Sequence, residues 1–534
     1  VILIIAVLGI LSIYVDKIPS PSTYATFWAL VPSVVAITLA LITKEVYSSL
    51  FIGIVIGSVF ASGFSFTGSI SNVLQDGLIA QLSDSYNVGI LIFLVILGTI
   101  VALMNKAGGS KAFGDWAATH IKTRQGAQLC TVLLGVLIFI DDYFNCLTVG
   151  SVMKPVTDKH RISRAKFAYV IDATAAPICI IAPVSSWAAA VSGFVKGEDG
   201  FGLFIKAIPY NYYSFLTLAM MIAMIVMKVE FGSMEKHELN ALKGDLLSMG
   251  DGKKTVTAEE TDVVNSNGKV VDLIIPIICL VICCIIGMIY TGGFFSGVSF
   301  VEAFSNSDAS VGLAIGSLFG LLITILLYVI RGVLDFGKCM EAIPEGFKAM
   351  VPAILILTFA WTLKTMTESL GAKEFVAGLV GGVSGPLLGL FPAIIFLVGA
   401  FLAFATGTSW GTFGILIPIV VNIFSGTNHT MMIISISACM AGAVCGDHCS
   451  PISDTTIMAS AGAQCNHMNH VSTQLPYAVL VAGISCLTYI IAGFVRNPVV
   501  PFIIGVLILI GTFVGIKYII KYITRTDKAN EQAE

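Results

Sequence analysis

The chain has 534 residues, of which 56% are hydrophobic and only 11% are charged, and its formal net charge is −3. A soluble domain carries about 25% charged residues, so this much apolar surface requires a lipid bilayer as its solvent. The balance of charges gives no basic field that would indicate a nucleic-acid partner. We therefore expect an all-α polytopic membrane protein.

Apolar stretches long enough to cross a bilayer recur along the whole chain. They lie at 1–15, 27–43, 45–62, 88–106, 165–195, 204–229, 270–291, 308–330, 345–366, 431–462, 475–494 and 500–520. We interpret the first as a shortened N-terminal helix, because it opens inside an apolar run. Polar clusters interrupt two more apolar regions, 127–156 and 387–424. For each of these we predict a re-entrant hairpin that enters and leaves on the same side.

The distribution of basic residues supports this arrangement. We place the turn at 44–45 in the cytoplasm and change sides at every span, but not at a hairpin. With this rule, 23 of the 29 Lys and Arg residues fall on the cytoplasmic side. Such an excess follows the positive-inside rule. It predicts a multi-pass membrane protein with a cytoplasmic N-terminus.

Weak internal similarity indicates that the chain is duplicated. The paired landmarks are Gly109 with Gly371, Pro155 with Pro418, and Asp172 and Pro177 with Asp447 and Pro451. The offsets are 262, 263 and, for the two prolines of the last landmark, 274 residues, and the spacing from Asp to Pro differs by one residue between the halves. Each half contains five spans and one hairpin, so the second half starts on the opposite side and runs inverted. Inverted repeats with interrupted helices are the architecture of secondary transporters.

The expected organisation has five parts. They are an N-terminal helix and loop (1–26), a first inverted repeat (27–229), a cytoplasmic linker (230–269), a second inverted repeat (270–494), and a C-terminal helix and tail (495–534). The linker mixes both charge signs with Gly and Ser, and we expect no chemistry there. Each repeat would contain one discontinuous helix beside its hairpin.

Polar residues gather at four interruptions, a hairpin tip and a broken span in each half. The candidate ion-binding residues are Asp142, Asn145, Thr148, Asp172, Thr174, Ser185, Ser186, Thr406, Thr408, Ser409, Asp447, Ser450, Ser453, Asp454 and Thr455. Proline and glycine open the helix there, and exposed backbone at membrane depth must be satisfied by protein or by a water-filled cavity. Carbonyl, hydroxyl and carboxylate oxygens together suit Na⁺ or Li⁺.

A carboxylate at the bilayer centre costs about 2.5–3.5 kcal/mol, and either a proton or a cation relieves that cost. Asp172 and Asp447 are the first candidates for this exchange and for a Na⁺ site, with Asp142 and Asp454 second. The alternative is that isolated polar residues only join helices by hydrogen bonds. His448 fits a proton carrier and a packed neutral side chain equally well.

Three classes of function stay open at this point. The first is a Na⁺(Li⁺)/H⁺ antiporter without cofactors, whose only ligands are the transported ions. The second is a Na⁺- or H⁺-coupled carrier of an organic anion or amino acid, in which Trp187 and Trp410 would line the substrate site. The third is a channel or a structural membrane protein, which fits inverted halves and buried carboxylates poorly. GDGKKT at 250–255 lacks the first glycine of a phosphate-binding loop, so the sequence supports neither an enzyme nor an ATP-driven pump. Cys465, His467 and His470 match no standard zinc spacing.

Three motifs carry a family resemblance. FIDDYFNCLTVGSVMKPVTDKHRISRAKFAYVIDATAAPICIIAPVSSW (139–187), GTSWGTFGILIPI (407–419) and CGDHCSPISDTT (445–456) resemble the NhaC-type sodium/proton antiporter family of the ion transporter superfamily. The resemblance implies a secondary carrier of the bacterial inner membrane, often a homodimer with elevator-like movement. It also implies Na⁺ and H⁺ as substrates, or malate, lactate or an amino acid moved with those ions.

Overall fold

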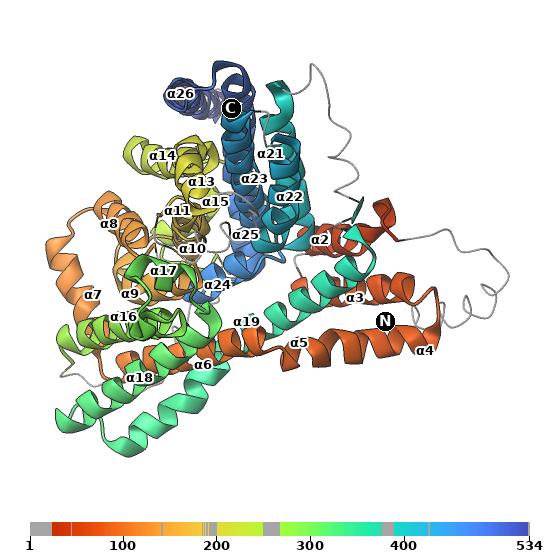
Figure 1. Cartoon of the computed structure of the whole chain (residues 1–534). Helices are drawn as coiled ribbons and strands as arrows, with labels where there is room; N and C mark the ends of the chain where they lie inside the picture. Colours follow the sequence, from red (N-terminus) through yellow and green to blue (C-terminus); the bar gives the residue numbers. More distant parts are fainter. Residues whose placement is uncertain are drawn as a thin grey trace.

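A computed structural model shows how the predicted spans are arranged (Figure 1). The structure describes residues 24–43, 45–139, 142–183, 185, 187, 191, 200–248, 268–372, 374–375, 389–424 and 428–531. Within these ranges the regular elements are all helical, with no strand. The predicted first helix at 1–15 lies outside the described residues. The all-helical membrane fold is confirmed, whereas the inversion of the repeats stays a prediction.

Some helices of the first half, such as those at 46–61 and 85–106, begin and end close to the predicted spans, whereas the helices at 66–83, 109–120 and 233–242 match no predicted span. The helices of the first half and linker are η1 (Phe27–Ala29), α2 (Val31–Thr43), α3 (Val46–Ala61), α4 (Phe66–Ser71), η2 (Asn72–Ile79), α5 (Ala80–Ser83), α6 (Ser85–Lys106), α7 (Gly109–His120), α8 (Arg124–Leu137), α9 (Asp142–Lys159), α10 (Arg164–Thr174), α11 (Ala176–Cys179), α13 (Gly200–Ala207), η3 (Ile208–Tyr210), α14 (Tyr212–Met227) and α15 (Ser233–Leu242).

The second half continues in the same way. Its helices are α16 (Val271–Thr291), η5 (Phe294–Ser296), α17 (Phe300–Ser305), α18 (Ala309–Ile330), α19 (Phe336–Ser369), α21 (Phe391–Thr406), α22 (Ser409–Phe424), α23 (His429–Cys449), α24 (Asp454–Ala463), α25 (His467–Val495) and α26 (Val499–Glu531). Side-chain caps fix several starts: Ser163 accepts from the Lys166 amide before α10, and Ser453 accepts from the Thr456 amide before α24.

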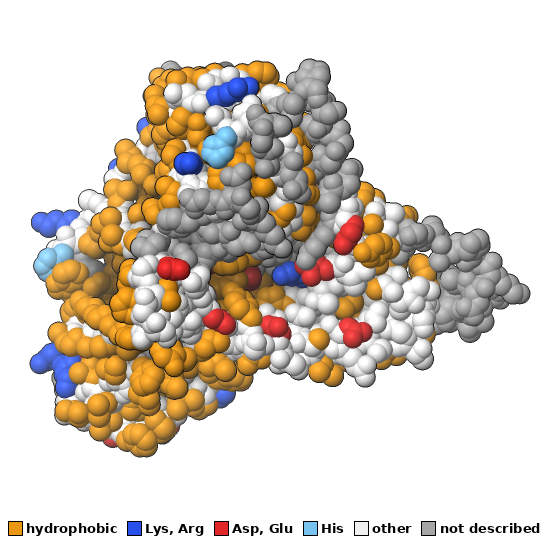
Figure 2. All heavy atoms as spheres, in the orientation of Figure 1, with side chains coloured by type: hydrophobic (Ala, Val, Ile, Leu, Met, Phe, Trp, Pro, Cys, Tyr) orange, Lys and Arg blue, Asp and Glu red, His pale blue; other side chains and the backbone are white. Residues whose placement is uncertain are grey.

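Six helices of the described chain are long and apolar enough to cross a membrane: α6, α16, α18, α23, α25 and α26. Two bent pairs raise the number to eight, because α13 with η3 meets α14 at 45°, and α19 bends by 43° near residue 352. The helices α2, α3, α21 and α22 are apolar but shorter. Apolar side chains also cover much of the visible surface (Figure 2). The chain is therefore a multi-pass membrane protein.

Both predicted hairpin regions are helix pairs. The first divides into α8 and α9, and the second divides into α21 and α22, which pack against each other. Gly407 ends α21 with φ +65°, and a side chain there would stand 2.5 Å from the Ile452 carbonyl oxygen. Only glycine fits this break without strain. That each pair enters and leaves on one side of the membrane stays a prediction.

Two buried cores divide the molecule, and helices of both halves contribute to each. One core joins α13, α14, α21, α22, α23, α25 and α26, and the other joins α2, α3, α6, α16, α18 and α19. Figure 1 shows α9, α10 and α24 between these groups. Helix α10 packs Tyr169 into the first core and Phe167 and Ile171 into the second. The helix that carries Asp172 therefore lies at the boundary between the cores.

Segments that the sequence places on one side of the membrane meet in the structure. Arg161 donates to the Leu242 carbonyl over 3.1 Å, and Ser233 donates to the Ser472 carbonyl over 2.9 Å. On the predicted opposite side, the Ala25 amide donates to the Leu370 carbonyl over 2.8 Å. These contacts agree with the predicted alternation of sides. They do not identify which side is cytoplasmic, and that assignment stays a prediction.

The linker differs from the expectation, because its first part is an integral helix. Helix α15 buries Met234, Glu238 and Ala241. The Glu238 carboxylate pairs with Arg124 at 2.6 Å and with Lys166 at 3.6 Å. A buried carboxylate needs such partners, since desolvating an unpaired charge is costly. At least one charged residue of this segment, Glu238, therefore belongs to an ion-pair network with the first half and not to a plain linker.

Candidate functional site

Asp172 and Asp447 hold equivalent positions at two helix ends. The Asp172 carbonyl accepts from the amide of Ala175, the residue that ends α10, over 3.1 Å. The Asp447 carbonyl accepts from the amide of Ser450, the residue that ends α23, over 2.9 Å. Each aspartate therefore precedes a break by the same number of residues. This is the arrangement that a duplicated broken helix predicts.

The first repeat landmark shifts by one residue in the structure. Gly108 and Gly371 both have φ +76° and follow the ends of α6 and α19. Their amides donate to the carbonyls of Asn105 and Glu368 over 3.0 Å in each case. The structural partner of Gly371 is thus Gly108, whereas the sequence similarity paired Gly109 with it. Helix-end geometry fixes the register more firmly than a short match of residue types.

Nitrogen donors surround the Asp172 carboxylate, which is 1% exposed. Its Oδ2 accepts from Gln474 Nε2 over 2.7 Å and lies 3.1 Å from His470 Nε2. Both partners come from the first turns of α25, in the segment between the predicted spans 431–462 and 475–494. This segment is not a loop, because residues 467–474 are helical, and His470 and Gln474 contact a buried carboxylate.

His448 links this carboxylate to a group of aromatic residues. Its Nδ1 lies 2.8 Å from the Tyr213 hydroxyl, and its ring stacks with Tyr169 at 6.2 Å between centroids. Gln474 Nε2 also donates to the His448 carbonyl. His448 and Asp172 interact electrostatically. The geometry places His448 beside the candidate site, and the choice between proton carrier and packed neutral side chain stays open.

A hydroxyl group is a hydrogen-bond partner of the Asp447 carboxylate, which is 2% exposed. The Ser409 hydroxyl lies 2.9 Å from Asp447 Oδ2 and 3.2 Å from the Ala443 carbonyl oxygen. Within the described part of the chain, no Lys, Arg or His side chain forms an ion pair with Asp447. Asp454 and Asp172 are near enough to interact with it electrostatically. This oxygen-rich, acidic surrounding differs in chemistry from that of Asp172.

Two hydrogen bonds join the first-half hairpin to the second-half break. The Thr455 hydroxyl donates to Asp142 Oδ2 over 3.1 Å, and the Tyr143 hydroxyl donates to Asp454 Oδ2 over 2.6 Å. The helices α9 and α24 approach closely, because a side chain at Gly150 would stand 2.5 Å from Gly462. The first-half hairpin and the second-half break therefore meet at this contact.

Asn145 holds three helix ends together. Its Nδ2 donates to the carbonyls of Gly135 and Ile138, each over 2.7 Å, and to that of Thr174 over 3.0 Å. These carbonyls lie at the ends of α8 and α10. The last carbonyls of a helix have no partner within the helix, so Asn145 supplies the missing donor. The Thr148 hydroxyl is buried and has no hydrogen-bond partner among the described residues. Asn145 is consequently a structural link through Nδ2, while its Oδ1, like the Thr148 hydroxyl, is buried without a hydrogen-bond partner in the described ranges and has capacity to bind a ligand.

Several other candidates bond locally to the backbone. Hydroxyls that donate to nearby or neighbouring carbonyls are those of Thr174 (to Val170), Ser185 (to Cys179), Thr406 (to Leu402) and Ser450 (to Phe404). Thr408 accepts from the Gly411 amide over 3.3 Å. Such bonds satisfy helix ends and leave the hydroxyl oxygens as possible cation ligands. Ser186 lies outside the described residues.

The histidines at the start of α25 have protein partners. His467 lies 3.0 Å from Ser460 Oγ and 2.7 Å from the Pro451 carbonyl oxygen, and His470 bonds to Asp172. His467 thus fixes the break between α23 and α24. The sequence analysis considered these histidines only for zinc and missed their contact with the break. A polar run after a broken helix, His467 to Gln474, was the signal available.

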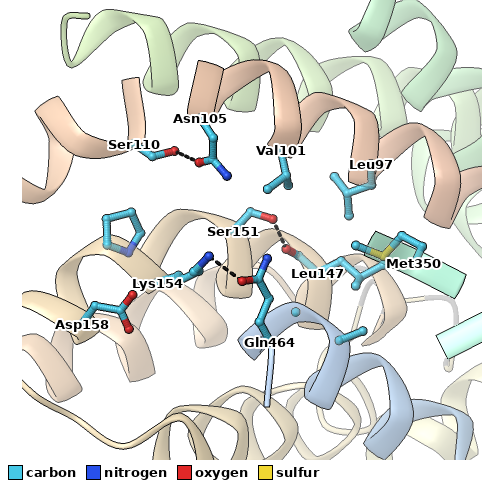
Figure 3. Close-up of a pocket in the computed structure, with 13 residues that line it drawn as sticks. Leu97, Val101, Asn105, Ser110, Leu147, Ser151, Lys154, Asp158, Met350 and Gln464 are labelled. Carbon is cyan, nitrogen blue, oxygen red and sulfur yellow. Dashed lines mark hydrogen bonds between the residues drawn. The ribbon is translucent and has the colours of Figure 1, made fainter. Parts of the chain in front are cut away.

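A small cavity lies beside the contact between α9 and α24 (Figure 3). Its polar lining includes Lys154, which donates to Gln464 Oε1 over 2.5 Å, and Ser110, which donates to Asn105 over 2.6 Å. Gly462 also lines it, seven residues from Thr455 and hence about 10 Å along α24. The cavity therefore lies at the far end of α24 from the candidate carboxylates, none of which lines it.

Aromatic side chains from both halves meet near the second hairpin. Trp187 lies 5.5 Å from Trp410 and 5.7 Å from Phe413 between ring centroids. Trp187 is fully buried, and its indole N–H has no hydrogen-bond partner in the described ranges. The two tryptophans that the sequence analysis named together are brought together. Their arrangement offers an apolar wall and one free donor.

Broken helices, buried carboxylates and a multi-pass fold define the class of a membrane transporter. Residues 195–494 match the model of the Na⁺/H⁺ antiporter family. An uncharacterized protein of Haemophilus influenzae is 37% identical over 495 residues, which cover 90% of this chain and 93% of that protein. The chain belongs to the Na⁺/H⁺ antiporter family, and the resemblance seen in its motifs is confirmed.

Two relatives of known substrate match shorter segments. A malate-2H⁺/Na⁺-lactate antiporter of Bacillus subtilis is 26% identical over 169 residues, which cover 30% of this chain and 34% of that protein. An arginine/ornithine antiporter of Halobacterium salinarum is 34% identical over 162 residues, which cover 30% of this chain and 33% of that protein. The family of this chain thus consists of transporters rather than enzymes.

Proposed function

We propose that the chain exchanges Na⁺ or Li⁺ for H⁺ across a bacterial inner membrane, with Asp447 as the group that binds cation and proton in turn. One observation carries this proposal. Asp447 is buried without a basic partner among the described residues, its Oδ2 accepts from the Ser409 hydroxyl, and its Oδ1 has no hydrogen-bond partner in the described ranges. A buried carboxylate must be neutralised by a proton or by a bound cation. Hydroxyl and carbonyl oxygens are the ligands that a hard monovalent cation prefers.

Asp172 has a supporting role in this proposal. Its Oδ2 is occupied by nitrogen donors from His470 and Gln474, and N–H groups cannot coordinate a cation. A protonated His470 would balance the Asp172 charge without Na⁺. The two equivalent aspartates thus have different roles in this proposal. Asp447 carries the exchanged ion, and Asp172 with His470 responds to protonation beside it.

Asp142 and Asp454 complete the acidic surroundings of the proposed site. Asp142 accepts a hydrogen bond from the Thr455 hydroxyl, and Asp454 accepts one from the Tyr143 hydroxyl. Both bonds cross the contact between α9 and α24. Lys364 on α19 interacts electrostatically with Asp454 and offsets part of the negative charge. A cation that reaches Asp447 would therefore pass through a region of negative potential, which raises its local concentration.

A second candidate function is Na⁺- or H⁺-coupled transport of an organic anion or amino acid. The observation that favours it is the buried Trp187 indole N–H, which has no partner in the described chain and lies against Trp410. A carboxylate of the substrate would accept from it. The names of the Bacillus subtilis and Halobacterium salinarum relatives agree with this alternative.

Proteoliposomes that contain a pH-sensitive dye distinguish the two candidates. The full-length protein is reconstituted and challenged with Na⁺, Li⁺ or K⁺ in the absence of any organic solute. Proton efflux driven by Na⁺ or Li⁺ supports cation/proton exchange. Movement of protons only after malate, lactate, arginine or ornithine is added supports the second candidate and contradicts the first.

A further inference from the structure

A second charged cavity lies away from the aspartates, where α8, α14, α15 and α26 meet. It encloses about 230 Å³ of space open to water-sized molecules. Its lining residues are Arg124, Lys228, Val229, Glu230, Glu235, Glu238, Leu239, Leu242 and Lys517. Its chemistry is unlike that of the transport site, because it combines three basic side chains with three acidic ones and two exposed leucines.

The ion pairs inside this cavity leave a specific set of charges available. Arg124 pairs with Glu238, and Glu230 pairs with Lys166. Over the described ranges, Lys228, Lys517 and Glu235 form no ion pair. Lys517 makes only a 3.5 Å contact with the Met227 carbonyl. Two ammonium groups and one carboxylate thus line the cavity with hydrogen-bonding capacity to spare.

Apolar stripes on the outer surface run up to this cavity. On α8, Leu129 and Leu133 are exposed, and on α14, Ile222 and Val226 are exposed. The two helices are adjacent here, because Gln125 donates to the Ile225 carbonyl over 3.0 Å. In a membrane protein such exposed stripes face acyl chains. Val226 is two residues from Lys228, so the apolar surface ends where the free charges begin.

We propose that this cavity binds the headgroup of a phospholipid that carries both a phosphate and a primary amine, with its acyl chains along α8 and α14. Lys228 and Lys517 bind the phosphate oxygens as point charges. Glu235 accepts from the amine. The exposed Leu239 and Leu242 of α15 also line the cavity and would contact the part of the lipid next to its headgroup. Basic residues at the membrane surface hold anionic lipid groups in this way.

The location gives such a lipid an influence on the transport site. Glu230 and Glu238 line the cavity, and both also contact Lys166 of α10. Asp172 lies on the same helix, six residues further on. A bound headgroup would hold α15 against α8 and α14 and thereby keep the acidic partners of Lys166 in place. The proposed lipid is therefore a structural cofactor of the boundary helix and not a transported molecule.

Native mass spectrometry of the purified full-length protein tests the proposal. The delipidated protein is titrated with phosphatidylethanolamine, with phosphatidylglycerol, and with soluble glycerophosphoethanolamine and inorganic phosphate. We expect phosphatidylethanolamine to bind more tightly than phosphatidylglycerol. The combined variant Lys228→Gln and Lys517→Gln should weaken lipid binding about tenfold or more, since it removes both basic residues that bind the phosphate.

A matched variant controls for general loss of positive charge. Lys236 and Lys243 are exposed residues of α15 and its end that do not line the cavity. Lys236→Gln with Lys243→Gln should leave lipid binding unchanged, and Glu235→Gln should remove the preference for phosphatidylethanolamine over phosphatidylglycerol. Equal lipid binding by the two double variants would overturn the proposal. Competition by glycerophosphoethanolamine or phosphate at the concentration of the lipid would instead identify a soluble phosphate site and overturn it as well.

Discussion

The Tyr143 hydroxyl donates to Asp454 Oδ2 over 2.6 Å, so a hairpin of the first half holds a carboxylate of the second half. Both side chains lie at the contact between α9 and α24, next to the bond between Thr455 and Asp142. The candidate site is consequently not contained in either half of the chain. It forms only where the interrupted helices of the two halves are packed together.

Replacing Tyr143 by Phe should slow exchange about tenfold. The change removes one hydrogen bond to a charged group, which contributes about 1.5–3 kcal/mol, and leaves the ring in place. The measurement is the initial rate of Na⁺-driven proton efflux from liposomes. Tyr290→Phe is the control, because Tyr290 is 61% exposed at the end of α16. Equal rates for both variants would show that the bond to Asp454 has no part in transport.

Asp172 depends on its partners from α25. His470→Ala leaves Gln474 as the side-chain donor to Asp172 within the described residues and should lower the exchange rate about tenfold. His470→Gln keeps an N–H group and should recover most of the rate while changing the pH profile. His120→Ala serves as the control on the exposed face of α7. Wild-type pH profiles for both His470 variants would contradict the proposed response of this pair to protonation.

The close approach of α9 and α24 should not tolerate a side chain. In Gly150→Ala, the new methyl group would stand 2.5 Å from Gly462, so the helices must separate. We expect a loss of about 1–3 kcal/mol in the free energy of unfolding, measured by thermal or denaturant unfolding in detergent. Gly483→Ala should be neutral, because nothing lies within 4 Å of the added atom. A neutral Gly150→Ala would mean that this contact is loose.

The ion pair at the base of α10 should make stability depend on pH. Burial raises the pKa of the Glu230 carboxyl above its ordinary value of 4.5, although the Lys166 ammonium opposes this. The folded state therefore binds this proton more tightly than the unfolded state does. Its contribution to the free energy of unfolding falls as the pH rises from the ordinary pKa through the raised one. Thermal unfolding of wild type and Glu230→Gln across this range should give a flatter profile for the variant.

Much of this structure could be predicted from the sequence. The hairpin at 387–424 is visible because Gly407 interrupts an apolar run, and Gly407 indeed ends α21 with positive φ. Asp172 and Asp447 could be paired through the prolines that follow them, and both precede a helix end by the same distance. Local patterns of Pro, Gly and polar residues within apolar runs thus fix where the helices break.

The remaining parts depend on contacts that hydropathy does not record. Gln474 and His470 look like loop residues, yet they bond to a carboxylate 302 and 298 positions earlier in the chain. Glu238 looks like a solvated linker residue, yet its carboxylate is buried between Arg124 and Lys166. In each case a polar side chain is buried because a distant partner compensates its charge. A single sequence does not reveal such partners.

The proposed exchange at Asp447 is tested most directly by Asp447→Asn in proteoliposomes. Asparagine keeps the size of the side chain and can still accept from Ser409, but it carries no charge and takes up no proton. We predict no Na⁺-driven proton efflux above that of protein-free liposomes, while the variant elutes and unfolds like wild type. Asp335→Asn, at the exposed start of α19, should exchange normally. Wild-type exchange by Asp447→Asn would contradict the account.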